Sequence, residues 1–359
     1  MPLMLKDAIP TAEISRVLVI KLRHHGDVLL ATPALTTLKH ALPHAEIDAL
    51  VYRDTAPMLD DHPALANLYC IDRAWKHRGI AAQAAAEWGL LQRLRARRYD
   101  LIVHLTEHQR GAWLTRLLAP RWAVAPKRPG RFWAGSFSHQ TLRAPTRRHT
   151  VEVNLDALRR IGIHPTAADK RVTLVPGAAA EARVAELLAA NKLAPGKFIH
   201  LHPTSRWLFK CWPAASFAAL CRALGEQGWP IVLTTAPDAA EMALVAAIKA
   251  QCAWPVVDLS GQLALKELAA LTAQARLFVG VDSAPMHIAA AMGTPTVALF
   301  GPSGDIEWGP WQSPSRIVTS TSHPCRPCGL DGCGGGKLSE CLAELPVEHV
   351  LAACEALLA

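Results

Sequence analysis

The sequence has no apolar run long enough to cross a membrane. None approaches the ~20 consecutive apolar residues that a membrane-spanning helix needs, and the first fourteen residues contain Lys6, Asp7 and Glu13 instead of a continuous apolar core. We therefore expect neither a signal peptide nor a membrane anchor, and a cytoplasmic protein. Hydrophobic residues make up 51% of the chain and charged residues 19%, which excludes a disordered chain and is typical of a soluble α/β enzyme.

Two common nucleotide-binding motifs are also absent. No GxGxxG follows the first predicted strand, where the turn from Leu22 to Asp27 reads LRHHGD. The glycine-rich stretch from Gly332 to Lys337 follows no strand, and Leu338 stands where a Walker loop has Ser or Thr. The sequence therefore argues against nicotinamide and P-loop chemistry.

Cysteine-based metal motifs are incomplete. Five of the nine cysteines are scattered among apolar or helical residues, as expected of reduced core thiols: Cys70, Cys211, Cys221, Cys252 and Cys354. The other four lie in a glycine-rich loop: Cys325, Cys328, Cys333 and Cys341. This loop begins with CxxC, but no second CxxC follows. The sequence favours a metal-free loop over a structural zinc site and leaves both open.

The length of the chain and its charge distribution indicate two different halves. A chain of 359 residues exceeds the usual size of one core, so we expect two domains. The part up to Val175 has 26 basic and 15 acidic residues, and the remainder has 12 and 15. The basic side chains gather in two stretches: Arg93, Arg95, Arg97 and Arg98, then Lys127, Arg128, Arg131, Arg143, Arg147 and Arg148. Such a face attracts nucleic acid, anionic lipid or a phosphorylated substrate, or is merely solvated.

Strand and helix patterns alternate along both halves, which is typical of doubly wound parallel sheets. The first half has predicted strands at Arg16–Lys21, Glu46–Val51 and Leu101–His104, and predicted helices at Asp27–Ala41, Ala81–Arg98, Gly111–Leu118 and Val151–Ile161. Lys127–Thr150 has no period and reads as a basic loop. The second half has predicted strands at Phe198–His202, Ile231–Thr235, Val256–Leu259, Leu277–Val281 and Thr296–Phe300. We expect a linker near residues 165–180 and a ligand cleft at the carboxyl ends of the strands.

The segment Leu277–Pro302 predicts a strand, helix, strand unit with a ligand at its first turn. Ser283 can cap the helix and Pro285 suits its first turn. Backbone amides at such a helix start favour an anion, so a diphosphate is expected here. His287 on the same helix is either a ligand contact or a buried core histidine.

Three other positions are candidate site residues, each with a plainer alternative. Asp27 is a candidate general base or a helix cap. His202–Pro213 (HPTSRWLFKCWP) offers Thr204, Ser205, Arg206 and Lys210 as a phosphate clamp, or Trp207 and Trp212 as packing anchors with a solvated lysine. Glu241 could accept hydrogen bonds from ribose hydroxyls, or could simply be an acidic residue that stabilises the start of a helix.

Three stretches in this order resemble the ADP-heptose lipopolysaccharide heptosyltransferases, glycosyltransferase family nine: IKLRHHGDVLLATPAL, HPTSRWLFKCWP and VGVDSAPMHIAAAMGTPTVALFGP. The resemblance extends from about Arg16 to Leu358. The loop HPCRPCGLDGCGGGKLSEC, the stretch IVHLTEHQR and the form VDSAPMH are most similar to the heptosyltransferase III branch.

The resemblance implies an α/β protein with the GT-B fold, in which two Rossmann-like domains face a central cleft. Residues 1–172 would bind the acceptor and residues 173–359 ADP-heptose, with the last helix able to pack back on the first domain. The implied reaction is an inverting transfer of heptose to the inner core of lipopolysaccharide, as a side branch on its second heptose. A GT-B epimerase and a non-catalytic nucleotide- or lipopolysaccharide-binding protein are the alternatives.

The resemblance also implies roles for single residues. Asp27 matches the proposed base, Lys210 the lysine at the donor phosphates, Thr204 and Ser205 the hydroxyls near the diphosphate, and Glu241 the acid that contacts ribose. Asp282, Ser283, Ala284 and His287 match the signature D[ST]GxxH, with Ala284 in place of its usual glycine. We expect Arg23, His24, Glu107 and Arg110 to contact the acceptor.

The expected partners are ADP-heptose, the phosphorylated inner core and the cytoplasmic face of the inner membrane, with no nucleic acid, metal or cofactor. The basic face of the first half would hold core phosphates and draw the protein to the membrane surface.

Overall fold

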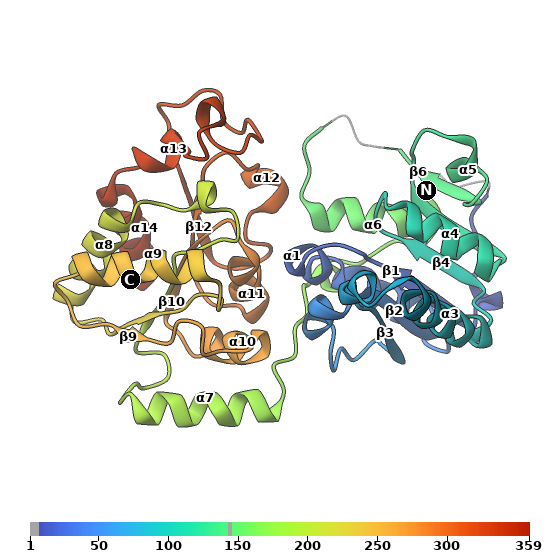
Figure 1. Cartoon of the computed structure of the whole chain (residues 1–359), viewed down its shortest axis with the longest axis horizontal. Coiled ribbons are helices and arrows are strands. Elements are labelled where there is room, and N and C mark those ends of the chain that lie inside the picture. The colour runs from blue at the N-terminus through green and yellow to red at the C-terminus, as the bar shows by residue number, and fades with distance from the viewer. Residues whose placement is uncertain (1–6, 143–145) are drawn as a thin grey trace. The chain divides into compact units, whose positions relative to one another are not determined.

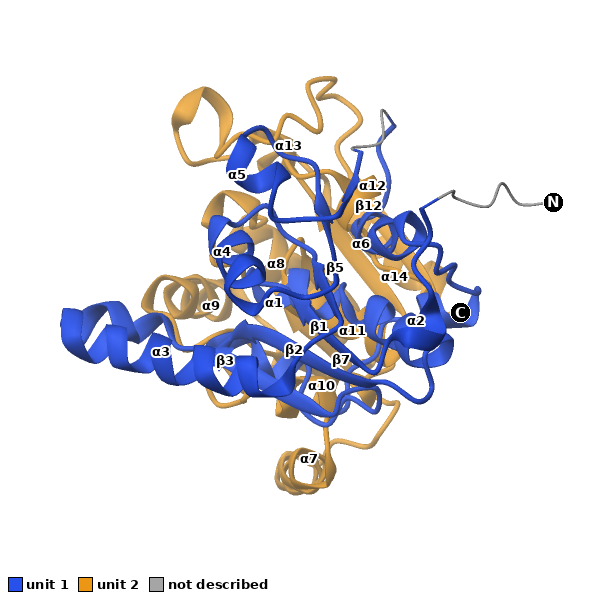
Figure 2. Cartoon of the chain, turned by 90° about the vertical axis from the view of Figure 1, so that its right-hand side faces the viewer, with its two compact units in different colours: residues 1–175 blue, residues 176–359 orange. Residues whose placement is uncertain are grey.

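A computed structural model describes residues 7–142 and 146–359 of the chain, so that Arg143 of the basic stretch lies outside the described residues. The chain divides into two compact units, unit 1 with residues 1–175 and unit 2 with residues 176–359 (Figure 2). Within the described part of the chain, no helix is both long enough and apolar enough to traverse a lipid bilayer.

Unit 1 contains a six-stranded sheet in the order β3-β2-β1-β4-β5-β6, and every pairing is parallel. Its strands are β1 (Arg16–Ile20), β2 (Glu46–Tyr52), β3 (Asn67–Ile71), β4 (Leu101–His104), β5 (Trp122–Pro126) and β6 (His139–Thr141). The central β1 is apolar because it is covered on both faces; Val17, Leu18 and Ile20 are fully buried. The reversal of strand order beside β1 places the loops after β1 and β4 next to one another.

Helices cover both faces of this sheet. They are α1 (His25–Leu29), α2 (Thr32–Ala41), α3 (Ile80–Arg97), α4 (Gln109–Leu118), α5 (Arg131–Ala134) and α6 (Thr150–Arg160). Helices α2 and α6 pack against each other, while α3 packs on α4 and α4 on α5 (Figure 1). The predicted helix over Asp27–Ala41 is in fact two helices, because α1 ends at Leu29 and α2 starts at Thr32, followed by Pro33. The stretch Lys127–Thr150, predicted as a loop, contains α5 and β6.

Unit 2 repeats this architecture with the strand order β12-β11-β10-β7-β8-β9, again all parallel. Its strands are β7 (Ile199–His202), β8 (Ile231–Leu233), β9 (Val257–Asp258), β10 (Leu277–Val281), β11 (Thr296–Phe300) and β12 (Ser315–Thr319). The strand order reverses between β10 and β7, so the loops that leave these neighbouring strands meet at the carboxyl edge of the sheet.

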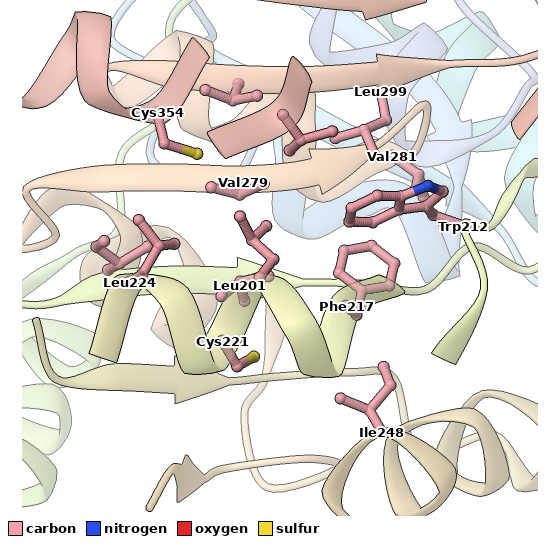
Figure 3. Close-up of a cluster of buried hydrophobic side chains, with 14 of the residues drawn as sticks. Leu201, Trp212, Phe217, Cys221, Leu224, Ile248, Val279, Val281, Leu299 and Cys354 are labelled. Atoms are coloured by element: carbon pink, nitrogen blue, oxygen red, sulfur yellow. The ribbon is translucent and has the colours of Figure 1, made fainter. Parts of the chain in front are cut away.

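The helices of unit 2 form two layers around this sheet. They are α7 (Ala178–Ala190), α8 (Ala214–Glu226), α9 (Ala239–Gln251), α10 (Leu265–Ala273), α11 (Ala284–Met292), α12 (Asp305–Trp308), α13 (Glu340–Ala343) and α14 (Val347–Leu358). The layer of α8, α9 and α14 buries Leu201, Phe217 and Val279 in one large cluster (Figure 3). The opposite layer contains α7, α10 and α11, which contact one another in sequence (Figure 1).

The last helix belongs to the core of unit 2. Helix α14 packs on α8, β10, β11 and β12, and its Val350 and Cys354 are fully buried there. Arg276 also donates a hydrogen bond to the carbonyl of Leu358 at 2.9 Å. The sequence left open a packing of this helix on the first domain, whereas these contacts lie within its own unit.

Candidate functional site

An ion pair marks the carboxyl edge of the unit 2 sheet. Lys210 ends a short 3₁₀ turn after β7, and Asp282 follows β10 directly. The ammonium of Lys210 lies 2.6 Å from Oδ2 of Asp282, and the two side chains are only 18% and 8% exposed. Lys210 is therefore not the solvated lysine of the plainer alternative. Its ammonium also lies 5.0 Å from the centre of the Trp207 ring, while Trp212 is the buried packing anchor.

A second polar cluster lies at the ends of β7 and β8. The hydroxyl of Thr204 donates to Oε2 of Glu241 at 2.7 Å and lies 2.6 Å from the hydroxyl of Thr235. Thr235 is 3.3 Å from the same carboxylate oxygen. Glu241 is only 6% exposed, although it occupies the first turn of α9. The cap of this helix is Asp238, which accepts from two backbone amides. The Thr204 hydroxyl thus serves Glu241 instead of pointing outward as a phosphate clamp would require.

The helix start at α11 is built as the sequence predicts, with one difference. Ser283 is the N-cap residue and Ala284 and Pro285 open the helix, but the Ser283 hydroxyl donates to the carbonyl of Val281 at 3.2 Å and not to a helix amide. The first amides of α11 keep their capacity to bind an anion. His287 is 4% exposed and its ring centre lies 6.4 Å from that of Trp308, so it is a buried histidine.

In unit 1, Asp27 is the third residue of α1 and is half-buried. The N-cap is His24, so the helix-cap alternative for Asp27 is wrong. No residue among those described donates a hydrogen bond to its carboxylate. Lys21 lies nearby at the end of β1, and it is 6% exposed. Burial lowers the pKa of Lys21 to about 8, against the opposing charge of Asp27.

Comparisons with known proteins assign this pair of units. The model of "Glycosyltransferase family 9 (heptosyltransferase)" matches residues 88–337. Lipopolysaccharide heptosyltransferase 3 of Escherichia coli K12 is 36% identical over 343 residues, which cover 94% of this chain and 96% of that protein. The chain belongs to glycosyltransferase family 9. Its membership shows that it is a glycosyltransferase, against the epimerase and the non-catalytic alternatives.

Solved structures confirm the expected fold of this family 9 transferase. The family 9 enzyme from Veillonella parvula has a TM-score of 0.83 at 21% identity and covers 99% of each chain. Heptosyltransferase WaaC of E. coli with ADP-2-deoxy-2-fluoro heptose has a TM-score of 0.73 at 21% identity and covers 95% of this chain and 99% of that one. The α/β prediction with a GT-B fold is therefore confirmed.

The predicted acceptor residues of the transferase follow β1 and β4: Arg23, His24 and Glu107 precede the next helices, and Arg110 lies in the first turn of α4. Arg23 and Glu107 are exposed, and their carbonyls accept from Arg73 at 3.4 Å and from Arg128 at 2.8 Å. Arg110 donates to Glu87 at 2.5 Å. His24 is half-buried at the start of α1.

One basic cluster connects these loops, and its centre is a residue that the sequence analysis missed. Partial burial of His108 and the positive charges of Arg110, Arg23 and Arg128 lower the pKa of this histidine. The three arginines, which follow β1, β4 and β5, are therefore close enough to act on one ring. The spacing of His108 and the three arginines in the sequence does not predict that they lie close together.

The cysteine loop of the transferase holds no assembled metal site. Cys325 and Cys328 are exposed, Cys333 is half-buried and Cys341 is buried. Among residues 7–142 and 146–359, no group of three or more Cys, His, Asp or Glu side chains is arranged to hold a metal ion. The loop folds through other contacts, such as the hydrogen bond from Ser339 to the carbonyl of Phe209 at 2.6 Å.

Proposed function

We propose that this transferase moves heptose from ADP-heptose to the inner core of lipopolysaccharide, as a side branch on its second heptose. The similarity to a lipopolysaccharide heptosyltransferase 3 along nearly the whole chain supports the acceptor. The ADP-sugar in the WaaC structure, which shares this fold, supports the donor. The single observation that carries the proposal is the edge of the unit 2 sheet, where an ammonium, a helix start and a buried carboxylate follow three neighbouring strands.

Unit 2 supplies the chemistry that an ADP-sugar requires. The Lys210 ammonium, the Ser205 hydroxyl and the first amides of α11 would hold the diphosphate and take up its charge as ADP leaves. Glu241 would accept a hydrogen bond from the ribose. Thr204 acts on Glu241 in this arrangement, so we assign it to the ribose side and no longer to the diphosphate.

Unit 1 supplies the base and the acceptor surface. The carboxylate of Asp27 would take the proton from an acceptor hydroxyl, whose oxygen then attacks the anomeric carbon while the bond to the ADP oxygen breaks. One displacement of this kind inverts the anomeric configuration. Arg23, His24, Glu107 and Arg110 would contact the core sugars and their phosphates, and the basic residues of this unit would hold the enzyme on the cytoplasmic face of the inner membrane.

The test is the release of ADP from ADP-heptose with and without heptosylated core acceptor, in the presence of EDTA. We expect acceptor-dependent release in chelator that is lost on Asp27→Ala, with ADP binding unchanged. Asp7→Ala is the matched control, because Asp7 is a surface aspartate of unit 1 that pairs with Arg160. Tight binding of ADP-heptose without release, on any truncated core, would contradict the acceptor assignment. Release by Asp27→Ala at the wild-type rate would exclude Asp27 as the base.

A further inference from the structure

A line of buried polar side chains crosses unit 2 and ends at Glu241. It starts on α10, passes between β7 and β8, and lies on the face of the sheet that α7, α10 and α11 cover. Each member is at most 6% exposed: Thr272, His200, Thr234, His202, Thr204, Thr235 and Glu241. Buried polar groups of this kind are retained only where each has a partner, so the direction of every hydrogen bond can be worked out.

The direction is set at the α10 end. The hydroxyl of Thr272 donates its single proton to the carbonyl of Leu268 at 2.6 Å, so at 3.0 Å it must accept from Nδ1 of His200. Burial lowers the pKa of His200 well below its usual value, so the ring is neutral and its Nε2 is an acceptor. Thr234 therefore donates to that Nε2 at 2.7 Å.

The hydrogen bonds of the second histidine, His202, also have a defined direction. The Thr234 proton is already engaged, so Thr234 accepts from Nδ1 of His202 at 2.9 Å. Burial lowers the pKa of His202 to about 3, which leaves its Nε2 unprotonated, 3.4 Å from the hydroxyl of Thr204. His202 thus presents a lone pair and not a proton to Thr204. The Thr204 proton goes to Oε2 of Glu241 at 2.7 Å, so the hydroxyl of Thr235, which is 2.6 Å from that of Thr204 and 3.3 Å from the same carboxylate oxygen, is the donor to Thr204.

One oxygen of this carboxylate stays available. Both hydroxyls lie on the Oε2 side of Glu241, and none of the side chains or amides that the structure describes donates to Oε1. A buried carboxylate fixed at one oxygen is a preorganised acceptor for a ligand hydroxyl.

Because His202 has no proton to give to Thr204, Thr235 is the donor that fixes this hydroxyl. We propose that Thr235 is a positioning residue that, through Thr204, aims Glu241 at the ribose diol and so sets the preference for ribose over a sugar without these hydroxyls. The proposal rests on the proposed use of unit 2 for an ADP-sugar. It assigns a role to a residue for which no contact with the ligand is proposed.

The test compares the binding of ADP and 2′,3′-dideoxy-ADP to the full chain by calorimetry. Wild type should bind ADP at least tenfold more tightly, as expected for a hydrogen bond to a charged acceptor. Thr235→Val and Thr235→Ala should each lower this preference about tenfold, and Thr235→Ser should restore it. Thr296→Val is the matched control: Thr296 is a fully buried strand residue whose hydroxyl donates only to the carbonyl of Thr294, at 2.8 Å.

The outcomes separate the two levels of the argument. If Thr235→Val and Thr235→Ala keep the wild-type preference for ADP, the positioning role is overturned and the donor site stands. If wild type binds both nucleotides equally, Glu241 does not bind the ribose hydroxyls, and the positioning role of Thr235 is overturned as well. If wild type binds no ADP, the proposed function itself fails. If the Thr235 variants bind both nucleotides more weakly by the same factor, Thr235 has a purely structural role and the proposal is also overturned.

Discussion

The ligand edges of the two units are built in opposite ways. In unit 2 the polar side chains are buried and bond to one another, as Lys210 does with Asp282 and Thr204 with Glu241. In unit 1, Asp27 and the predicted acceptor residues are exposed or half-buried, and Arg110 pairs with Glu87 at the surface. Lys21 is the exception, because it is buried and donates to Asn154 at 3.0 Å. Buried, mutually bonded groups are fixed before a ligand arrives, whereas exposed charges adapt to a large partner at little stability cost. The difference fits a small, defined donor in one unit and a bulky anionic acceptor in the other.

The largest expected effect comes from the fixed charge of unit 2. Lys210→Ala should lower kcat by about 10²–10³, the range seen when one preorganised donor to a developing negative charge is removed. Steady-state kinetics with saturating acceptor measures it. Lys210→Arg, which keeps the charge but changes its geometry, should recover part of the loss. If Lys210→Ala loses no more activity than Lys266→Ala on α10, the ammonium has no part in catalysis.

The second prediction concerns acid, which should affect unit 2 through its buried histidines. The pKa of His202 is about 3 in the folded chain against 6.5 as the ordinary value. Between these values the unfolded chain binds a proton that the folded chain refuses, so stability falls as the pH decreases from 6.5. His202 alone should contribute a loss of about 2 kcal/mol at pH 5. The buried His62, His104 and His200, whose pKa values are also lowered, should add to it.

Denaturant unfolding at pH 7 and pH 5 measures this loss. His202→Gln should show a decrease smaller than wild type by about 2 kcal/mol, whatever its stability at pH 7. His164→Gln, at an exposed histidine of unit 1, should behave like wild type. An unchanged pH difference in His202→Gln would show that this histidine is protonated equally in both states.

The third prediction divides binding from turnover. Asp282→Asn removes the carboxylate beside Lys210, so ADP should bind several-fold more tightly, because a competing negative charge is gone. At the same time kcat should fall about tenfold, because the ammonium loses the hydrogen bond that orients it. Calorimetry and steady-state kinetics on one preparation give both numbers. A parallel fall in binding and turnover would assign Asp282 to ligand binding itself.

The smallest effect is expected at the exposed edge of unit 1. Arg110→Gln breaks a pair whose side chains are 30% and 33% exposed, so stability should change by less than about 1 kcal/mol. The KM for a phosphorylated core acceptor should rise about threefold at low salt and return toward wild type at high salt. Arg183→Gln, at a surface pair of unit 2 with Glu186, is the control and should leave this KM unchanged. A KM insensitive to salt in wild type would contradict a charged acceptor surface.

The sequence predicted the central strands except β5, and of the four edge strands it predicted only β9, at Val256–Leu259. Strands β1, β4, β10 and β11 are continuous apolar runs because both of their faces are covered. The edge strand β12 is largely exposed at Arg316 and Ile317 and has no such run, and the edge strand β6 contains only three residues. A pattern of buried residues therefore could not reveal them.

The candidate site shows the same division. Lys210, Glu241 and Asp282 stand out because charged residues follow apolar strands. Their partners could not be predicted, because Lys210 and Asp282 are 72 residues apart and Thr204 and Glu241 are 37 apart, and only the strand order brings them together. His200 and His202 read as strand residues, and nothing in their spacing shows that they bond to Thr234.

Because Lys210 pairs with Asp282, any anion that binds this lysine must compete with the enzyme's own carboxylate. The carboxylate of Asp282 is always present at the same effective concentration. The net binding free energy of an anion at Lys210 is therefore the difference between its own attraction to the ammonium and that of the aspartate. A monoanion carries the same charge as the aspartate that it must displace, so its net attraction to Lys210 is small. A diphosphate brings more charge and can engage the amides of α11 at the same time. In the proposed donor site, the pair would therefore favour a diphosphate over chloride, acetate and single phosphates.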